Sequence, residues 1–257
     1  MAGGAYRLCD LHVHTEHSSD ATGTIGQAVR AAAERGVEVL AITNHCPELP
    51  GSIWHDSLRK LQDMKAQAAA AGRKYGLRVL VGAEIEVIDF VGNLNAPDLF
   101  IKQCDLVIAA VHWFPGLYYD EQQRPRVNAY TRQDVVPMSM KMIVGAVRNR
   151  AVDIIAHIGY ELAATKQPQR FLDQPQDYPE LYIQQIATEA ARGGTAIEIN
   201  EAGFPDERFL RICLEAGCTF ALGSDAHEPS KVGRLDWACQ MVERLGIGPD
   251  RLLYGRP

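Results

Sequence analysis

The segment Cys9-Asp10-Leu11-His12-Val13-His14-Thr15 lies near the start of the chain and reads as a strand that runs into a loop. Side chains alternate between the two faces of a strand, so Asp10, His12 and His14 are expected on one face and the two apolar residues between them on the other. Two histidines at i and i+2, preceded by a carboxylate, are spaced to hold one metal ion at a strand end. A chance cluster on a solvated strand is the alternative, and the rest of the sequence must decide.

Composition limits the class of protein. The chain has 257 residues, 47% hydrophobic and 23% charged, enough to bury one large α/β core or two small ones. A net charge of −6, a pI near 5.8 and the lack of any Lys/Arg-rich run argue against a nucleic-acid-binding or membrane-surface patch. No apolar run has signal-peptide or membrane-spanning length. The six scattered cysteines favour reduced thiols and a cytoplasmic location.

Strand-like and helix-like runs alternate along the whole chain, which is typical of parallel β-α units. After the first strand, further strands are expected at 37–43, 78–86, 106–111, 152–156, 196–200 and 219–223. Helices are expected at 25–35, 57–75, 97–104, 135–150, 179–192, 206–216 and 235–245. These seven units have no linker between them, so a single domain over residues 1–257 is expected. An open doubly wound sheet is the alternative, although no Gly-rich dinucleotide motif follows the first strand.

Polar side chains follow nearly every predicted strand, at the end where β/α barrels carry their active sites. Six of the eight histidines lie at these strand ends, on five different strands. A lone histidine after a strand is usually a hydrogen-bonded structural residue, but six on one rim favour a metal centre. Neutral imidazoles and carboxylates together are the ligands of zinc, manganese and iron. The strand-end residues are His12, His14, Asn44, His45, Glu84, His112, His157, Glu198, Asn200, Ser224, Asp225 and His227.

A series of motifs runs in order along nearly the whole chain. They are Asp-Leu-His-Val-His-Thr (10–15), Ser-Asp (19–20), Ile-Thr-Asn-His (42–45), Gly-Ala-Glu (82–84), His112, Ile-Ile-Ala-His (154–157), Ile-Glu-Ile-Asn (197–200) and Leu-Gly-Ser-Asp-Ala-His (222–227). Together they resemble the polymerase and histidinol phosphatase (PHP) superfamily, especially its small stand-alone bacterial phosphoesterases. The resemblance implies a distorted (β/α)7 TIM-like barrel, a site for three divalent transition metals (zinc, manganese or iron) and hydrolysis of phosphate esters.

The same resemblance implies roles for individual residues. The first metal would be held by His12, His14, Glu84 and Asp225. Glu84 would bridge to a second metal, completed by His112 and His157. The third would be held by Asp20, His45 and His227. Glu84, Asp225 and His227 are the expected catalytic residues, and the residues expected to support the ligands or face the substrate are Asp10, Asn44, Glu198, Asn200 and Ser224.

Four residues, Asn44, His17, His55 and Cys46, carry separate expectations. The superfamily usually has Asp where this chain has Asn44, so we expect a weaker third metal, because the amide lacks the carboxylate's charge. His17 and His55 are expected on the surface or in a substrate loop, and Cys46 is expected to have no role in the site.

The resemblance and the charge of the site favour a phosphate substrate. The positive charge of three divalent ions exceeds the negative charge of three carboxylates and one bridging hydroxide. The remaining positive charge suits a phosphomonoester dianion. We therefore expect a metal-dependent phosphoesterase in which a metal-bridging hydroxide attacks a small phosphorylated metabolite. Histidinol-phosphate-like compounds, nucleotides, sugar phosphates and phosphotyrosine peptides are the candidates.

Two other functions stay open. One is an amidohydrolase-type C–N hydrolase on the same metal barrel, where a carboxylated lysine commonly bridges the metals; here Glu84 fills that place and no lysine ends a strand. The other is an inactive metal-binding module, which the nine filled ligand positions disfavour. The sequence leaves the oligomeric state open, including a homo-oligomer.

Overall fold

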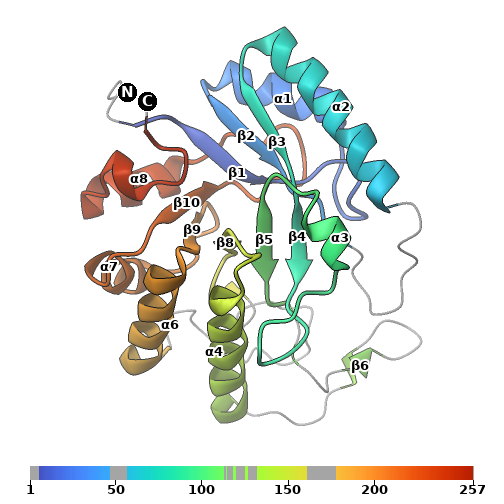
Figure 1. Cartoon of the computed structure of the whole chain (residues 1–257). Coiled ribbons are helices and arrows are strands. Elements are labelled where there is room, and N and C mark those ends of the chain that lie inside the picture. Colours follow the sequence, from blue (N-terminus) through green and yellow to red (C-terminus); the bar gives the residue numbers. More distant parts are fainter. Residues whose placement is uncertain are drawn as a thin grey trace.

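The computed structural model describes residues 6–46, 57–112, 114, 118–119, 125–126, 132–160 and 178–256. Figure 1 shows strands in the centre and helices around them. The strands are β1 (Cys9–Val13), β2 (Val39–Ile42), β3 (Arg78–Val81), β4 (Ala83–Glu86), β5 (Val107–Ala110), β6 (Tyr118–Tyr119), β7 (Pro125–Arg126), β8 (Ile154–Ile155), β9 (Ala196–Asn200) and β10 (Phe220–Gly223). The helices are α1 (Ile25–Glu34), α2 (Ser57–Tyr75), α3 (Asp98–Ile101), α4 (Arg132–Arg148), α6 (Glu180–Gly193), α7 (Glu207–Glu215), α8 (Asp236–Leu245) and the 3-10 helix η2 (Pro249–Arg251).

The core strands form two parallel sheets, in the orders β1-β2-β3 and β10-β9-β8-β5-β4. Only Gly82 separates β3 from β4. On the other side, the amide of Asp225 donates to the carbonyl of His12 (2.8 Å) and the amide of His14 to that of Ala226 (2.9 Å), which joins β10 to β1. The strands thus follow one another around a ring with helices outside it (Figure 1). This arrangement confirms the expected distorted (β/α)7 fold.

Two apolar clusters show which way each strand residue points. The inner cluster consists of residues from the strands and their ends, such as Leu11, Ile108 and Ile154, and the outer cluster lies between strands and helices. Leu11 belongs to the inner cluster and Val13 to the outer one, so the expectation that the apolar residues of the first segment share one face is wrong. The pairing of β1 with β2 shifts register between Asp10 and Val13, and such an irregularity turns the following side chains over.

Local chemistry explains several element ends. Thr24 and Gln27 form a reciprocal capping box at the start of α1, and α6 and α8 end at Gly194 and Gly246, which have the left-handed conformation that glycine adopts readily. The strand expected over 152–156 is reduced to Ile154–Ile155. The β6–β7 hairpin lies in a region for which no regular structure was expected.

Some expectations are not tested. Residues 47–56 and 161–177, including His55, lie outside the described residues, and a single domain stays a prediction. No helix in the described part of the chain is both long and apolar enough to cross a membrane.

The division of the predicted strand 78–86 at Gly82 leads to a stability prediction. A Cβ on Gly82 would lie 1.8 Å from the carbonyl oxygen of Leu106, which is backbone and cannot move aside. We expect Gly82→Ala to lower the free energy of unfolding by roughly 2–4 kcal/mol, measured by urea denaturation. Gly26→Ala is the matched control, because its Cβ would meet nothing closer than 3.8 Å inside α1. It should raise stability by roughly 0.5–1 kcal/mol, and equal effects of the two changes would contradict this view of Gly82.

Candidate metal centre

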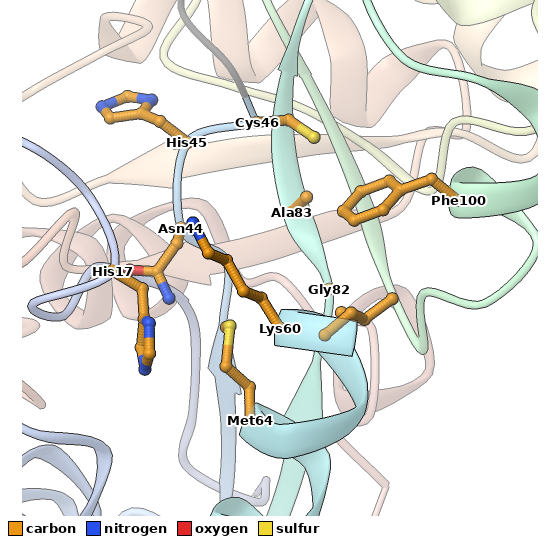
Figure 2. Close-up of a pocket in the computed structure, with 10 residues that line it drawn as sticks. His17, Asn44, His45, Cys46, Lys60, Met64, Gly82, Ala83 and Phe100 are labelled. Carbon is orange, nitrogen blue, oxygen red and sulfur yellow. The ribbon is translucent and has the colours of Figure 1, made fainter. Parts of the chain in front are cut away.

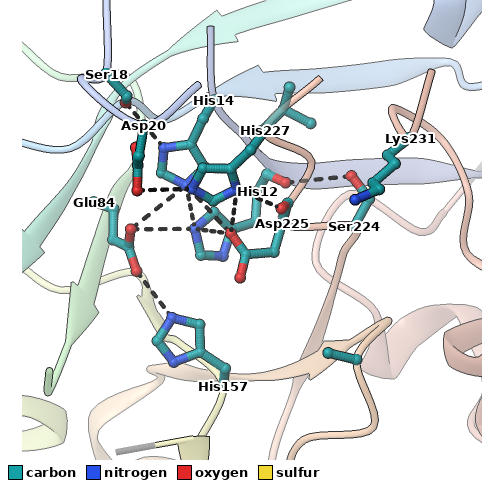
Figure 3. A network of polar contacts seen from close by, with 12 residues as sticks. His12, His14, Ser18, Asp20, Glu84, His157, Ser224, Asp225, His227 and Lys231 are labelled. Atoms are coloured by element: carbon teal, nitrogen blue, oxygen red, sulfur yellow. Dashed lines mark hydrogen bonds and ion pairs between the residues drawn. The ribbon is translucent and has the colours of Figure 1, made fainter. Parts of the chain in front are cut away.

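The ends of β1, β4 and β10 bring four potential ligand atoms together, as Figure 3 shows. Nε2 of His12 and Nε2 of His14 are 3.0 Å apart, and Oε2 of Glu84 lies 3.5 Å from each. Oδ1 of Asp225 lies 3.6 Å and 3.4 Å from the same two nitrogens. Four ligands about 2.1 Å from a tetrahedral zinc ion are about 3.4 Å apart, so the spacing of these atoms fits one such ion.

The other oxygen of Glu84 faces a second pair of histidines. Its Oε1 lies 3.0 Å from Nε2 of His157 and 3.5 Å from Nε2 of His112. Glu84 thus stands between two groups of ligand-type residues, the position that the sequence analysis gave it.

The three residues expected at the third metal also lie together. Oδ2 of Asp20 is 3.5 Å from Nε2 of His45 and 3.4 Å from Nε2 of His227. The ring of His14 lies against both histidines, with centroids 4.4 Å from His45 and 4.3 Å from His227. His14, His45 and His227 also have ring nitrogens within 4.8 Å of one another. The three groups are therefore continuous through His14 and Glu84.

Four of the histidines are anchored through Nδ1 and present Nε2 to the cluster. Nδ1 of His12 contacts Oε1 of Glu198 (2.7 Å), and Nδ1 of His14 contacts Oγ of Ser18 (3.1 Å). Nδ1 of His112 contacts Oε2 of Glu86 (2.8 Å), and Nδ1 of His227 contacts the backbone carbonyl of Asp225 (2.9 Å). A hydrogen on Nδ1 leaves the Nε2 lone pair free, so these contacts select the tautomer that a metal requires.

Glu198 supports two ligands at once. Its Oε1 lies against Nδ1 of His12. Its Oε2 accepts from the backbone amide of His157 (2.6 Å) and from the side-chain amide of Asn200 (3.3 Å). A Cβ on Gly223 would lie 2.0 Å from Glu198 Oε1 and 2.8 Å from His12 Cβ. Position 223 therefore has room for glycine alone.

Glu86 is a supporting residue that the sequence analysis missed in this role. Its Oε1 accepts from the backbone amide of His112, and its Oε2 contacts Nδ1 of the same residue, each at 2.8 Å. The signal was present, because Glu86 lies two residues after Glu84 and strand side chains of this spacing share a face. The sequence alone could not separate a ligand from a residue that holds a ligand.

Asp10 lies away from the ligand atoms, and its contacts are compatible with the supporting role expected for it. Its carboxylate accepts from the amide and hydroxyl of Ser224 (2.9 and 2.7 Å) and from the amide of Gly233 (2.8 Å). The register shift in β1 separates Asp10 from the histidines. Burial raises the pKa of Asp10 to about 6, against the lowering effect of the Ser224 and Gly233 hydrogen bonds. Asp10 and Ser224 thus fasten the loop that carries Asp225.

Asn44 acts through Ser18, and its contacts differ from those expected at the third metal. Its Oδ1 accepts from the amide of Thr15 (2.7 Å) and from the hydroxyls of Thr15 and Ser18, both at 3.1 Å. The Ser18 hydroxyl has one hydrogen, which it donates to Asn44. Its oxygen can then accept from Nδ1 of His14 and from the backbone amide of His45. Asn44 therefore supports His14 as well as the loop of His45.

A small cavity lies beside Asn44, outside the ligand cluster. Figure 2 shows Asn44 and Lys60 at this cavity with His17, His45 and Cys46. Nδ2 of Asn44 is buried and has no hydrogen-bond partner among the described residues. His17 is exposed, in agreement with its expected surface position, while Cys46 is buried against the outer apolar cluster.

The electrostatics of the cluster follow from burying carboxylates among imidazoles. Burial alone would raise the pKa of Glu84, but His12, His112 and His45 hold it well below its usual range. Burial likewise works against the charged form of His12, yet Glu198, Asp225 and Glu84 raise its pKa well above the ordinary value. For His14 burial dominates and lowers the pKa to about 4. A cation would replace the protons that these carboxylates otherwise draw to the histidines.

Two observations test whether a metal fits these residues. Oε2 of Glu84 is buried and makes no well-aligned hydrogen bond within the described part of the chain, although it lies 2.9 Å from Nδ1 of His45 and 3.5 Å from Nε2 of both His12 and His14. An unsatisfied buried carboxylate oxygen is costly, and a metal ion at the centre of these donors removes that cost. His157 and Asp225 also have positive φ angles of 23° and 52°, a strain typical of residues held for a function. The residues therefore fit a metal centre.

Exposure shows where the site opens. The side chains of His12, His14 and Glu84 are at most 1% exposed, whereas those of Asp20, His227, His112 and Asp225 are 42%, 33%, 29% and 25% exposed. Tyr160 is 38% exposed and its ring contacts the rings of His157 and His112. These partly exposed residues form the mouth of the site.

Fold and site together define a β/α protein with a candidate metal centre at its strand ends. A family model described as "PHP domain" matches residues 10–202, three quarters of the chain. The chain belongs to the PHP domain family, which confirms the resemblance of its motifs.

Relatives and a solved structure agree with this membership. A "Probable phosphatase" of Thermoanaerobacter sp. strain X514 is 29% identical, over 96% of this chain and 89% of the relative. Another, of Caldanaerobacter subterraneus subsp. tengcongensis, is 30% identical over 96% of this chain and 86% of its own length. The structure of histidinol phosphate phosphatase from Lactococcus lactis, complexed with zinc, L-histidinol and phosphate, superimposes with a TM-score of 0.69 at 18% identity, covering 93% of this chain and 94% of that one. These relatives agree with the expectation of a phosphatase-type enzyme.

The contacts of Glu86 lead to a prediction about metal affinity. Glu86→Ala removes both hydrogen bonds to His112, so one metal of the cluster should bind roughly 10–100-fold more weakly while the others are unchanged. Metal titration of the apo protein measures each step. Glu34→Ala, an exposed change in α1, is the control and should leave all steps unchanged. If the Glu86→Ala and wild-type titrations superimpose, Glu86 does not position a ligand.

Proposed function

We propose that this protein is a metal-dependent phosphoesterase that hydrolyses small phosphomonoesters. The observation that carries the proposal is the position of Glu84: its Oε2 faces His12, His14 and His45, and its Oε1 faces His112 and His157. One buried carboxylate shared in this way is what two adjacent metal ions require. Two metals side by side occur in many enzymes that hydrolyse phosphate esters, where they stabilise the attacking and the leaving oxygen.

The proposed ligands divide among three ions. His12, His14, Glu84 and Asp225 would hold the first, Glu84, His112 and His157 the second, and Asp20, His45 and His227 the third. When bound, zinc, manganese or iron ions in these positions would supply a bridging hydroxide as nucleophile at neutral pH and a positive charge for the phosphoryl oxygens. Glu84, Asp225 and His227 are the residues we propose as catalytic.

The rest of the site does its work by holding these side chains in place. Glu198 fixes His12 and the backbone of His157, Glu86 fixes His112, and Ser18 fixes His14. The innermost side chains are almost fully buried, so among the described residues the partly exposed mouth marks the approach to the cluster. A phosphomonoester would therefore enter with its phosphoryl group first and leave its organic group at the mouth.

The proposed substrate is a small phosphorylated metabolite. The relatives named as phosphatases and the structural neighbour that acts on histidinol phosphate support a histidinol-phosphate-like compound, with nucleotides and sugar phosphates as the other candidates. We infer a cytoplasmic location from the six scattered cysteines, all of them free thiols in the structure. A homo-oligomeric state is compatible with this proposal and is not required by it.

The alternative of a C–N hydrolase on the same scaffold is less well supported. A carboxylated lysine commonly bridges the metals in such enzymes, whereas Glu84 stands in that place here. Parallel assays with an aryl phosphate and with an N-acetylated amine would separate the two reactions. Hydrolysis of the amide alone would overturn the phosphoesterase proposal.

Metal content gives the first test of this proposal. We expect two or three transition-metal ions per chain after loading with zinc or manganese, because ten ligand positions are filled when Glu84 is counted at both of its sites. Elemental analysis measures the content, and a chelator should abolish hydrolysis of an aryl phosphate. Fewer than one ion per chain after loading would count decisively against a metal centre.

The role of Glu84 gives the second test. Glu84→Gln keeps the size of the side chain but replaces the shared carboxylate with an amide, a much weaker metal ligand. We expect kcat/KM for aryl phosphate to fall more than about 100-fold, with an unchanged circular dichroism spectrum. Glu34→Gln on the exposed face of α1 is the matched control and should keep full activity. Near-wild-type turnover of Glu84→Gln would show that this residue does not bridge the metals.

A further inference from the structure

Tyr160 and Phe204 form a pair of aromatic rings at the mouth of the metal centre. Their centroids are 5.9 Å apart and their planes are nearly perpendicular, at 87°, which is a favourable aromatic geometry. Tyr160 comes from the turn after β8 and Phe204 from the turn after β9, so the two strand ends that carry His157 and Glu198 also carry this pair. We call Tyr160 and Phe204 the aromatic wall.

The aromatic wall lies directly against ligand-type residues. The ring of Tyr160 is 5.1 Å from that of His157 and 6.3 Å from that of His112, centroid to centroid. Figure 3 shows His157 and Asp20 at opposite ends of the cluster, with Glu84 between them. The wall therefore borders the second group of ligands, at the end of the cluster away from Asp20.

Backbone hydrogen bonds hold the two chain segments that carry these rings. The amide of Tyr160 donates to the carbonyl of His157 (2.9 Å), and the amide of Asn200 donates to the carbonyl of Phe204 (2.9 Å). Asn200 in turn donates to Glu198, the carboxylate that supports His12. A rigid aromatic surface binds a flat ring with little loss of side-chain entropy.

Exposure shows that the wall is available to a ligand. Tyr160 is 38% exposed although it lies next to the buried His157, and Phe204, in ring contact with it, is partly exposed. A tyrosine in this place offers a large apolar face to whatever occupies the mouth. The phosphoryl group belongs at the ligand cluster, so the organic group of a substrate is the part that would reach the wall.

We propose that the aromatic wall of Tyr160 and Phe204 selects phosphomonoesters whose organic group carries a flat, unsaturated ring close to the ester oxygen. This inference rests on the proposed phosphoesterase function and specifies its substrate class. Both aromatic carbocycles and heteroaromatic rings meet the requirement, because each presents a π-face and an edge to the wall. Saturated sugars and open-chain alcohols would gain much less from it.

Two substrates isolate the effect of a flat ring. Benzyl phosphate and cyclohexylmethyl phosphate both release a primary alcohol of similar size, but only the first contains a flat ring. For the metal-loaded enzyme, kcat/KM should favour benzyl phosphate. Tyr160→Leu and Phe204→Leu should each reduce this preference about three- to tenfold, mainly through KM, and leave cyclohexylmethyl phosphate within twofold of wild type.

Two further variants separate the wall from other effects. Tyr160→Phe keeps the ring and should keep the preference, which distinguishes the aromatic face from the hydroxyl. Tyr75→Leu, at the end of α2 and far from the ligand cluster, should change neither substrate. Equal losses on both phosphates, or an unchanged preference in both leucine variants, would overturn the proposal.

A binding experiment keeps this inference separate from the proposed function. Benzylphosphonate and cyclohexylmethylphosphonate are not hydrolysed, and calorimetry measures their affinity for the metal-loaded protein. Tighter binding of benzylphosphonate that is lost in Tyr160→Leu supports the wall even if no phosphomonoester is turned over. Hydrolysis without any difference between the two phosphonates would retain the phosphoesterase and overturn the wall.

Discussion

The charge of Glu84 is the constraint on which this site depends. A carboxylate that is almost fully buried must be compensated, and here the compensating groups are five histidines from four other segments of the chain. Each histidine around Glu84 is in turn held by a partner behind it, so the burial of one carboxylate fixes the orientation of a whole layer of side chains. The pKa shifts of Glu84 and His12 in opposite directions express the same balance.

The barrel supplies the geometry that this balance requires. Parallel strands end at one rim, which concentrates polar side chains there and leaves apolar ones below. Two glycines allow the final approach. Gly82 lets β4 lie close to the chain before β5, and Gly223 leaves space for the contact between Glu198 and His12. A methyl group at either place would separate elements that the site needs in contact.

Much of this was predictable because strand ends have a simple sequence signal. An apolar run followed by histidine or carboxylate indicated Glu84, His112 and His157 without any knowledge of their distances.

The register shift in β1 had no such signal, so Leu11 and Val13 were wrongly placed on one face. Glu86 was missed as a support for His112, because residue type does not reveal whether a carboxylate meets a metal or a ring N–H. Asn44 was linked to the third metal alone, whereas its contacts run through Ser18 both to His14 and to the backbone amide of His45. Hydrogen-bond partners of this kind depend on loop paths that alternation of polar and apolar residues does not encode.

The seam between β1 and β10 has a consequence for biosynthesis. His12 and His14 leave the ribosome more than 200 residues before Asp225 and His227. The backbone hydrogen bonds that join His12 to Asp225 and His14 to Ala226 cannot form until β10 and the residues after it have been made. Until then His12 and His14 lack the carboxylate of Asp225, whereas Glu84, His112 and His157 are already present in the chain. Closure of the ring and completion of the first proposed ligand group are therefore a single event.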